Sequence, residues 1–152
     1  MLRRSVVACP PGCVDAVIIR RNTAPTSAEV ARNAASTYPY RFDSNFYYLS
    51  GFAEPEAVLV LVIGEDKLEN LLFCREKDDE REIWDGYRYG PDAAAEAFGF
   101  DAAHPVAELD AKLADILKNQ PRVYFPFGQD AVWDRRLAGW LDAVRAQSRA
   151  GV

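Results

Sequence analysis

The feature that most constrains the fold is an uninterrupted apolar run, Ala57–Ile63, with the sequence AVLVLVI. A strand with one solvent-facing side alternates apolar and polar residues, whereas a run that is apolar at every position is typical of a strand covered on both faces in a layered α/β sheet. Gly64-Glu65-Asp66 then supplies a turn and Leu71–Cys74 a second strand, which together predict a hairpin. The side chains expected in the core of the first strand are Val58, Val60, Leu61 and Val62.

Shorter segments around this hairpin are assigned from residue preference and from glycine and proline positions. Val14–Ile19 is a predicted first strand, and Phe46–Leu49 favours a strand because it is aromatic. The polar stretch 20–36 shows no clean period, so its conformation stays open. Asp92–Phe98, followed by a glycine, predicts a short helix, and Val123–Phe125 a later strand. The alternation of strands and helices favours an α/β layer architecture.

Apolar residues recur at helical intervals in two segments of the last third of the chain. The first set, which ends at Pro121, comprises Leu109, Leu113, Ile116 and Leu117. The second set, which follows a predicted N-cap at Asp130, comprises Trp133, Leu137, Trp140, Leu141 and Val144. Four arginines are left toward solvent or a partner: Arg135, Arg136, Arg145 and Arg149. We therefore expect a closing helix whose two tryptophans are packed.

Length and charge limit the classes of function. The 152 residues suit a single domain, 1–152, and the net charge of −5 supplies no basic footprint for nucleic acid. The longest strongly apolar run has seven residues, against about 20 for a membrane span, so no membrane association is expected. Three cysteines are an odd count, which favours a reducing, cytoplasmic setting over a disulfide framework.

The residue types that carry catalysis are sparse. His104 is the single histidine, and no HExxH or CxxC pattern accompanies it, so a structural or surface histidine is the preferred interpretation over a metal ligand. Serine or cysteine hydrolysis needs a base, which only His104 could provide, and no GxSxG motif occurs. A self-contained hydrolase is not expected. A small nucleotide-binding protein is the weakest alternative, because no glycine-rich phosphate loop is present.

A run of eight charged residues, Arg75–Glu82, leads directly into Ile83 and Trp84. One interpretation is a solvated loop before a tryptophan-anchored turn and a helix. The other is an acidic and aromatic lip that presents Trp84 and Tyr87 to a partner, since exposed aromatic residues on rigid turns are favoured contact residues. Composition leaves both open.

Several spaced motifs carry a family resemblance. YPYR at Tyr38–Arg41, FYYLSGF at Phe46–Phe52, EPEAVLVL at Glu54–Leu61, and the segment from Lys77-Asp78 to EIWDGYRYG at Glu82–Gly90 occur in that order. They resemble the amino-terminal domain of Xaa-Pro aminopeptidase, or aminopeptidase P, over roughly residues 23–149. The resemblance implies the creatinase-like and prolidase-like fold of that domain: a mixed sheet with helices on both sides.

The resemblance also implies a division of labour. In the family, a separate pita-bread domain holds two manganese ions on two Asp, one His and two Glu, and it cleaves the bond before proline in peptide substrates. None of those ligands has a counterpart in this chain, which implies that the metallopeptidase hydrolase chemistry lies elsewhere and that the chain alone is inactive. The amino-terminal domain supplies the cleft rim and oligomer contacts, which by resemblance are carried here by Trp84, in a neighbouring subunit's cleft, and Arg149, along the substrate channel. An acidic rim residue of the family is replaced by Ala35.

The expectation is therefore a non-catalytic domain whose partners are a catalytic pita-bread domain or homologous subunits. The segment 1–13 departs from the longer helix usual in the family, so a truncated gene product is one expectation. The alternative function is a free-standing protein- or peptide-binding module on the same scaffold. A domain from a larger enzyme should expose a contiguous apolar patch, whereas an independent module should have that face made polar.

Overall fold

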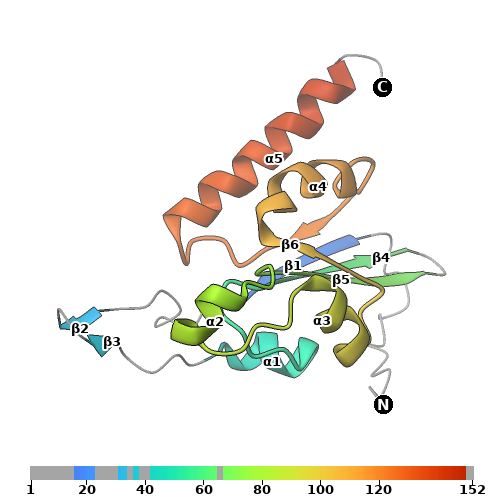
Figure 1. Cartoon of the computed structure of the whole chain (residues 1–152). Coiled ribbons are helices and arrows are strands. Elements are labelled where there is room, and N and C mark those ends of the chain that lie inside the picture. The colour runs from blue at the N-terminus through green and yellow to red at the C-terminus, as the bar shows by residue number, and fades with distance from the viewer. Residues whose placement is uncertain (1–15, 23–30, 34–35, 38–41, 65–66, 150–152) are drawn as a thin grey trace.

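Five strands form one mixed sheet in the order β6-β5-β4-β1-β7, shown in Figure 1. The structure is a computed structural model that describes residues 16–22, 31–33, 36–37, 42–64 and 67–149. The strands are β1 (Ala16–Arg21), β2 (Ala31–Asn33), β3 (Ser36–Thr37), β4 (Val58–Ile63), β5 (Leu68–Cys74), β6 (Ala102–Pro105) and β7 (Val123–Tyr124). The helices are α1 (Ser44–Ser50), α2 (Asp79–Asp85), α3 (Pro91–Phe98), the 3-10 turn η1 (Val106–Glu108), α4 (Leu109–Ile116) and α5 (Ala131–Arg149).

The predicted hairpin is the centre of this sheet. β4 pairs antiparallel with β5, Val60 opposite Leu71, and antiparallel with β1, Val60 opposite Ile19. β1 and β7 are parallel, as are β5 and β6, so the sheet is mixed. Val58 and Val60 are buried as expected, but Leu61 and Val62, in the second half of β4, are only half-buried. The central position of the strand is confirmed and the full burial of its second half is wrong.

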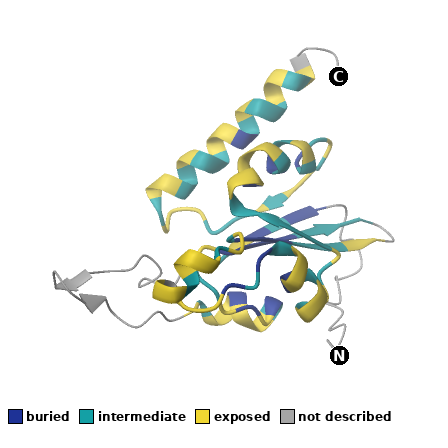
Figure 2. Cartoon of the chain, in the orientation of Figure 1, coloured by how far each residue is buried: buried dark blue, intermediate teal, exposed yellow. Residues whose placement is uncertain are grey.

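Helices cover both faces of the sheet, which confirms the predicted architecture. In Figure 1, α4 and α5 lie on one side of the sheet and α1 and α3 on the other. Figure 2 shows that the buried residues gather in the strands and on the helix surfaces between these layers. One core, between the sheet and the α4 and α5 layer, contains Val17, Ile19, Val58, Val60, Phe73, Leu109, Leu113, Leu117 and Trp140. Successive β4 residues point to opposite faces, so Leu59 joins the other core.

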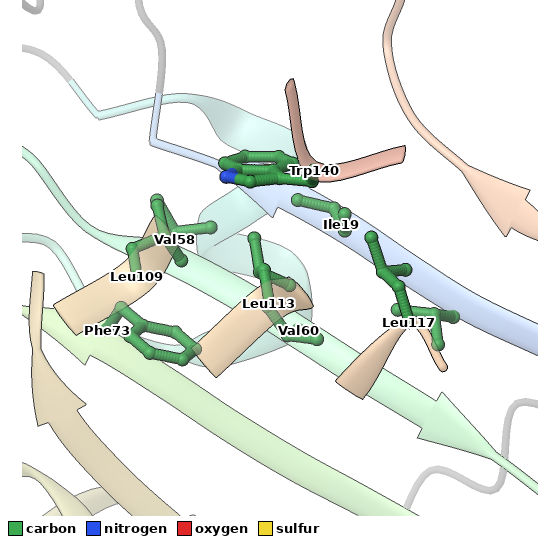
Figure 3. Packing of buried hydrophobic residues seen from close by; sticks show 9 residues of the cluster. Ile19, Val58, Val60, Phe73, Leu109, Leu113, Leu117 and Trp140 are labelled. Atoms are coloured by element: carbon green, nitrogen blue, oxygen red, sulfur yellow. The ribbon is translucent and has the colours of Figure 1, made fainter. Parts of the chain in front are cut away.

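The closing helix α5 follows the predicted pattern. Asp130 caps it, accepting a hydrogen bond at 2.8 Å from the backbone N–H of Val132. Trp140 is 3% exposed, and Figure 3 shows it packed beside Ile19 of β1. Trp133 is half-buried and contacts Trp140 edge-on, with ring centroids 6.2 Å apart. The expectation that both tryptophans pack on one helical face is confirmed.

The aromatic segment after Phe42 is a helix, α1, so the strand predicted at Phe46–Leu49 is wrong. Asp43 accepts a hydrogen bond at 2.8 Å from the backbone N–H of Phe46 and caps the first turn. Gly51, with φ of 69°, ends the helix in the left-handed conformation that glycine adopts freely. Phe46 and Ser50, four residues apart, are the buried positions. Strand preference of aromatic residues is context-dependent, and here the two caps decide the conformation.

A buried asparagine ties α1 to the sheet. Asn22, 3% exposed, donates from Nδ2 to the carbonyl oxygen of Glu54 at 2.7 Å and accepts at Oδ1 from the backbone N–H of Asp43 at 2.8 Å. The end of β1 is thereby fastened to the residues on both sides of α1. The predicted first strand is confirmed in place, although β1 begins at Ala16 and Val14 lies outside the described residues.

The remaining expected elements divide into confirmed and missed. The helix predicted at Asp92–Phe98 is α3, the stripe from Leu109 is α4, and the strand predicted at Val123–Phe125 is β7. β6 was not predicted, because Ala102–Pro105 carries no β-branched or alternating signal and forms only by pairing with β5. Within the described ranges, no helix combines the length and the apolar character that a membrane crossing requires.

Candidate contact site at the α2 turn

The second half of the charged run and the tryptophan after it form helix α2, so the solvated loop of the first interpretation is limited to residues 75–78. Asp78 caps the helix by accepting a hydrogen bond at 3.1 Å from the backbone N–H of Arg81. Acidic residues fill the first turn, where the helix dipole favours negative charge: Asp79, Glu80 and Glu82. The cap and these acids were the signal in the sequence that a helix starts inside the run.

The apolar residues of α2 and of the turn after it point into solvent. Ile83 is 78% exposed, Trp84 87% and Tyr87 62%. None of the three belongs to either core cluster. The expected exposure of Trp84 is confirmed, and large exposed apolar groups of this kind are typical of contact surfaces.

One carboxylate oxygen closes the turn beneath these aromatic residues. Oε1 of Glu82 accepts hydrogen bonds from Lys77 Nζ at 2.8 Å and from the backbone N–H of Arg88 at 3.0 Å. Lys77 Nζ also donates to the carbonyl oxygen of Arg88 at 3.4 Å and lies 4.7 Å from the ring centroid of Tyr87. We call Lys77, Glu82 and the backbone of Arg88 the α2 brace.

A glycine makes room for the brace. Gly90 has a φ of 74°, and a Cβ atom added there would lie 3.2 Å from Cβ of Lys77 and 3.3 Å from its backbone nitrogen. Any other residue at position 90 would therefore push against the strand-to-helix segment that carries Lys77. The chain after β5 and the chain before α3 approach closely at this point.

The side of the turn nearer the core is fixed by a second carboxylate. Oε1 of Glu54 accepts a hydrogen bond from the backbone N–H of Tyr89 at 2.8 Å, and Oε2 lies 3.8 Å from Nη2 of Arg75. The ring of Tyr89 contacts Phe98 at 5.1 Å and Tyr87 at 5.0 Å between centroids. The turn is thus anchored on its inner side, and its outer side carries Trp84.

The surroundings of the brace and of the nearby core shift the pKa values of Glu82, Lys77 and Cys74. The hydrogen bond from Lys77, followed by the one from the Arg88 backbone, holds the pKa of Glu82 below its usual value. The hydrogen bond to Glu82 raises the pKa of Lys77. Burial, with Glu54 nearby, raises the pKa of the Cys74 thiol to about 12, so this thiol stays protonated at neutral pH.

The other residues singled out in the sequence lie apart from this turn or outside the described part. Arg149 is the last residue of α5, so it belongs to the helix and does not follow it. Ala35 lies outside the described residues. His104 lies in β6, half-buried, with its ring centroid 5.5 Å from that of Phe73, and burial lowers its pKa.

Two further exposed aromatic sites were missed. Tyr47 and Tyr48 on α1 are 43% and 86% exposed, and Phe127, in the loop before α5, is 73% exposed. The exposure of the first pair follows from the helical period of α1, which was not predicted. Residues 46, 49 and 50 face inward, and the two tyrosines face outward. Among the described residues, no group of three or more His, Cys, Asp or Glu side chains is arranged to hold a metal ion, so these residues do not fit a manganese pair.

Fold and site together define a layered α/β domain with exposed aromatic side chains on a braced turn. A family profile described as the amino-terminal domain of aminopeptidase P matches residues 22–124. The chain belongs to this family of aminopeptidase P amino-terminal domains.

Relatives and solved structures agree with this assignment. Xaa-Pro aminopeptidase of Escherichia coli is 43% identical over 122 residues, which cover 80% of this chain and 28% of the relative. The zinc-substituted E. coli aminopeptidase P in complex with product superposes with a TM-score of 0.80 at 38% identity, over 90% of this chain and 30% of that one. Pseudomonas aeruginosa aminopeptidase PepP gives a TM-score of 0.79 at 40% identity, with the same shares covered. The chain thus spans less than a third of each of these proteins.

Proposed function

We propose that this chain is the rim-forming amino-terminal domain of a manganese-dependent Xaa-Pro aminopeptidase, an enzyme that releases the residue preceding proline from a peptide. The observation that carries the proposal is the exposure of Trp84 on the braced α2 turn in a domain of this family. In the proposed assembly a pita-bread domain performs the chemistry, and this domain supplies part of the cleft wall and contacts between subunits in a cytoplasmic homo-oligomer.

Physical properties of Trp84 support its role in the cleft rim. An indole that is 87% exposed has no packing function in this chain, and tryptophan is among the residues that contribute most to contact energy when a partner covers it. The pyrrolidine ring of proline is apolar, and proline-containing peptides are recognised elsewhere by aromatic-lined grooves. Arg149, at the end of the nineteen-residue α5, is the second proposed rim residue.

The metal chemistry is assigned to the partner domain. The relatives are more than three times as long as the matched segment, which leaves ample chain for a catalytic domain. When bound there, two manganese ions would activate the attacking water. For this chain we propose binding and positioning roles only, and we expect the purified protein to release no residue from Xaa-Pro peptides, with or without added manganese.

A chimeric enzyme tests the proposal. The segment of E. coli Xaa-Pro aminopeptidase that matches this chain is replaced by this chain, and hydrolysis of an Xaa-Pro peptide is measured with manganese. We expect activity within about tenfold of the parent and a raised KM in the Trp84→Ala chimera, because a contact made equally in the ground and transition states changes KM. A chimera with unchanged kcat and KM after Trp84→Ala would show that Trp84 is not a rim residue.

A free-standing binding module remains the second candidate, and the exposed Tyr48 and Phe127 favour it, since they give the isolated domain contact surfaces of its own. The two candidates differ in one measurement. A module should bind Xaa-Pro peptides as the isolated chain, detectable by calorimetry, whereas a rim domain should not bind them without the catalytic domain.

A further inference from the structure

We propose that Glu82 is a positioning residue whose carboxylate, held by Lys77, fixes the α2 turn and thereby sets where Trp84 stands against a partner. The inference rests on the proposed function for the identity of that partner. The brace itself is a property of this chain. Glu82 touches no substrate in this proposal and acts through Trp84.

The hydrogen bonds of the brace restrain one short segment, residues 82–88. The hydrogen bond from the Arg88 N–H to Glu82 closes residues 82–88 into a ring that contains Trp84 and Tyr87. Lys77 joins this ring to the segment after β5 through both Glu82 and the Arg88 carbonyl oxygen. Three contacts thus converge on one end of the turn, and Trp84 stands at the other.

The burial of these residues indicates that the brace orders the turn and contributes little to the free energy of unfolding of the domain. Ile83, Trp84 and Tyr87 are exposed and lie outside both core clusters, so apolar packing reaches this outer part of the turn only through the ring contact between Tyr87 and Tyr89. The side chain of Lys77 is 48% exposed and that of Glu82 19%, and ion pairs open to water add little to the free energy of unfolding. Loss of the brace should therefore loosen the turn while the domain stays folded.

The first experiment measures backbone order in the isotope-labelled chain by NMR relaxation. In the Glu82→Ala variant, order parameters of residues 83–87 should fall from about 0.85 to below about 0.6, while those of β4 and α5 stay unchanged. Glu80→Ala is the matched control, because Glu80 is an exposed glutamate in the same helix without a place in the brace. Residues 83–87 that remain as rigid in Glu82→Ala as in Glu80→Ala would overturn the proposal.

A titration provides a signature that packing alone would not produce. The Arg88 amide proton should shift with the protonation of Glu82, with a midpoint below the ordinary glutamate value of 4.5. Lys77 and Arg88 are the charged groups that act on this carboxylate, and Asp79 and Tyr87 act in turn on Lys77. Lys77→Met should raise the midpoint and Lys77→Arg should restore it, and a midpoint indifferent to both changes would contradict the brace.

The chimeric enzyme links the brace to function. Glu82→Ala should raise KM about as much as Trp84→Ala, with kcat changed less than about twofold. The double variant should raise KM little further, because both changes remove the same contact, the one made by Trp84. A Trp84→Ala effect without a Glu82→Ala effect would sink the positioning role alone. A Trp84→Ala change without effect would remove the proposed function, whereas the relaxation and titration results would still decide whether the brace exists.

Discussion

Helix α5 and the α2 turn both carry tryptophan, but they hold it by opposite means. On α5, Trp140 is buried against the sheet and its indole Nε1–H donates to Asp110 at 2.7 Å. On α2, Trp84 stands in solvent above a polar brace. The same side chain is therefore packed into the core on α5 and left exposed on α2, where hydrogen bonds of Lys77 and Glu82 hold the turn.

The neighbours of the tryptophans sharpen this contrast. Arg21 and Arg136 lie 5.0 and 4.4 Å from the ring centroid of Trp133, and each arginine is paired with an aspartate, Asp130 or Asp110. Two cations on one indole are tolerated because each is neutralised by its own carboxylate. Among the described residues, no ring contact or cation–π contact with Trp84 is found.

The largest expected effect is the loss of Trp140. Trp140→Ala removes a fully packed indole and leaves the Asp110 carboxylate without that donor, so it should lower the free energy of unfolding by about 3–5 kcal/mol. Denaturant melts of the variant and the parent chain measure this difference. A loss below about 1 kcal/mol would mean that α5 is not packed on the sheet in solution.

A smaller loss is expected at Trp133, because this side chain is only half-buried. Trp133→Ala should lower the free energy of unfolding by about 2–3 kcal/mol, below the range for a fully buried aromatic residue. Trp133→Phe keeps an aromatic face for Arg21 and Arg136 and serves as the control. If Trp133→Ala costs more than Trp140→Ala, the cation contacts matter more than burial does.

Acid should act on α5 through its cap. The hydrogen bond from Arg21, followed by the one from the Val132 backbone, lowers the pKa of Asp130 below its ordinary 3.8, so the charged form is favoured in the folded state. The resulting stabilisation is present above the unfolded pKa and is lost as the pH falls through the lower folded pKa. Arg21→Gln should raise the Asp130 pKa, measured by NMR titration, and flatten the fall of the melting temperature below about pH 4. An unmoved Asp130 pKa would show that the ion pair is absent in solution.

The smallest effect on stability is expected at the exposed tryptophan. Trp84→Ala should change the free energy of unfolding by no more than about 0.5 kcal/mol, as is usual for surface sites. Acrylamide should quench the fluorescence that Trp84 contributes, obtained by subtracting the emission of Trp84→Phe, more strongly than the remaining emission. The reverse order of quenching would place Trp84 in a packed site.

The sequence predicts correctly those elements whose buried residues recur in a regular apolar pattern. The continuous apolar run of β4 and the helical stripe at Leu109 and Leu113 reflect contact with the core directly. α1 is hard to predict because the strand preference of Phe46 and its neighbours opposes the helix signals of the cap at Asp43 and the glycine at position 51. β6 was missed because its pairing with β5 leaves no local signal.

The candidate site divides in the same way. The exposure of Trp84 followed from the resemblance to the family, and it was correct. The brace could not be predicted, because it depends on Lys77 and Arg88, which lie on either side of α2, meeting in the folded turn. Hydrogen bonds between side chain and backbone at such separations require the folded turn to be known.

The amide of Asn22 has a consequence for the chemical ageing of the protein. Its nitrogen faces the carbonyl oxygen of Glu54 and its oxygen faces the N–H of Asp43, so both halves of the group are in use. Hydrolysis of this amide to aspartate would set a carboxylate oxygen against the Glu54 carbonyl at the distance of the lost hydrogen bond, and two acceptors repel each other. Burial keeps water from the group while the chain is folded. Each unfolding event therefore exposes a site at which a single hydrolysis would remove a hydrogen bond between the end of β1 and the residues after α1, which leaves Phe46 to hold that helix on the sheet.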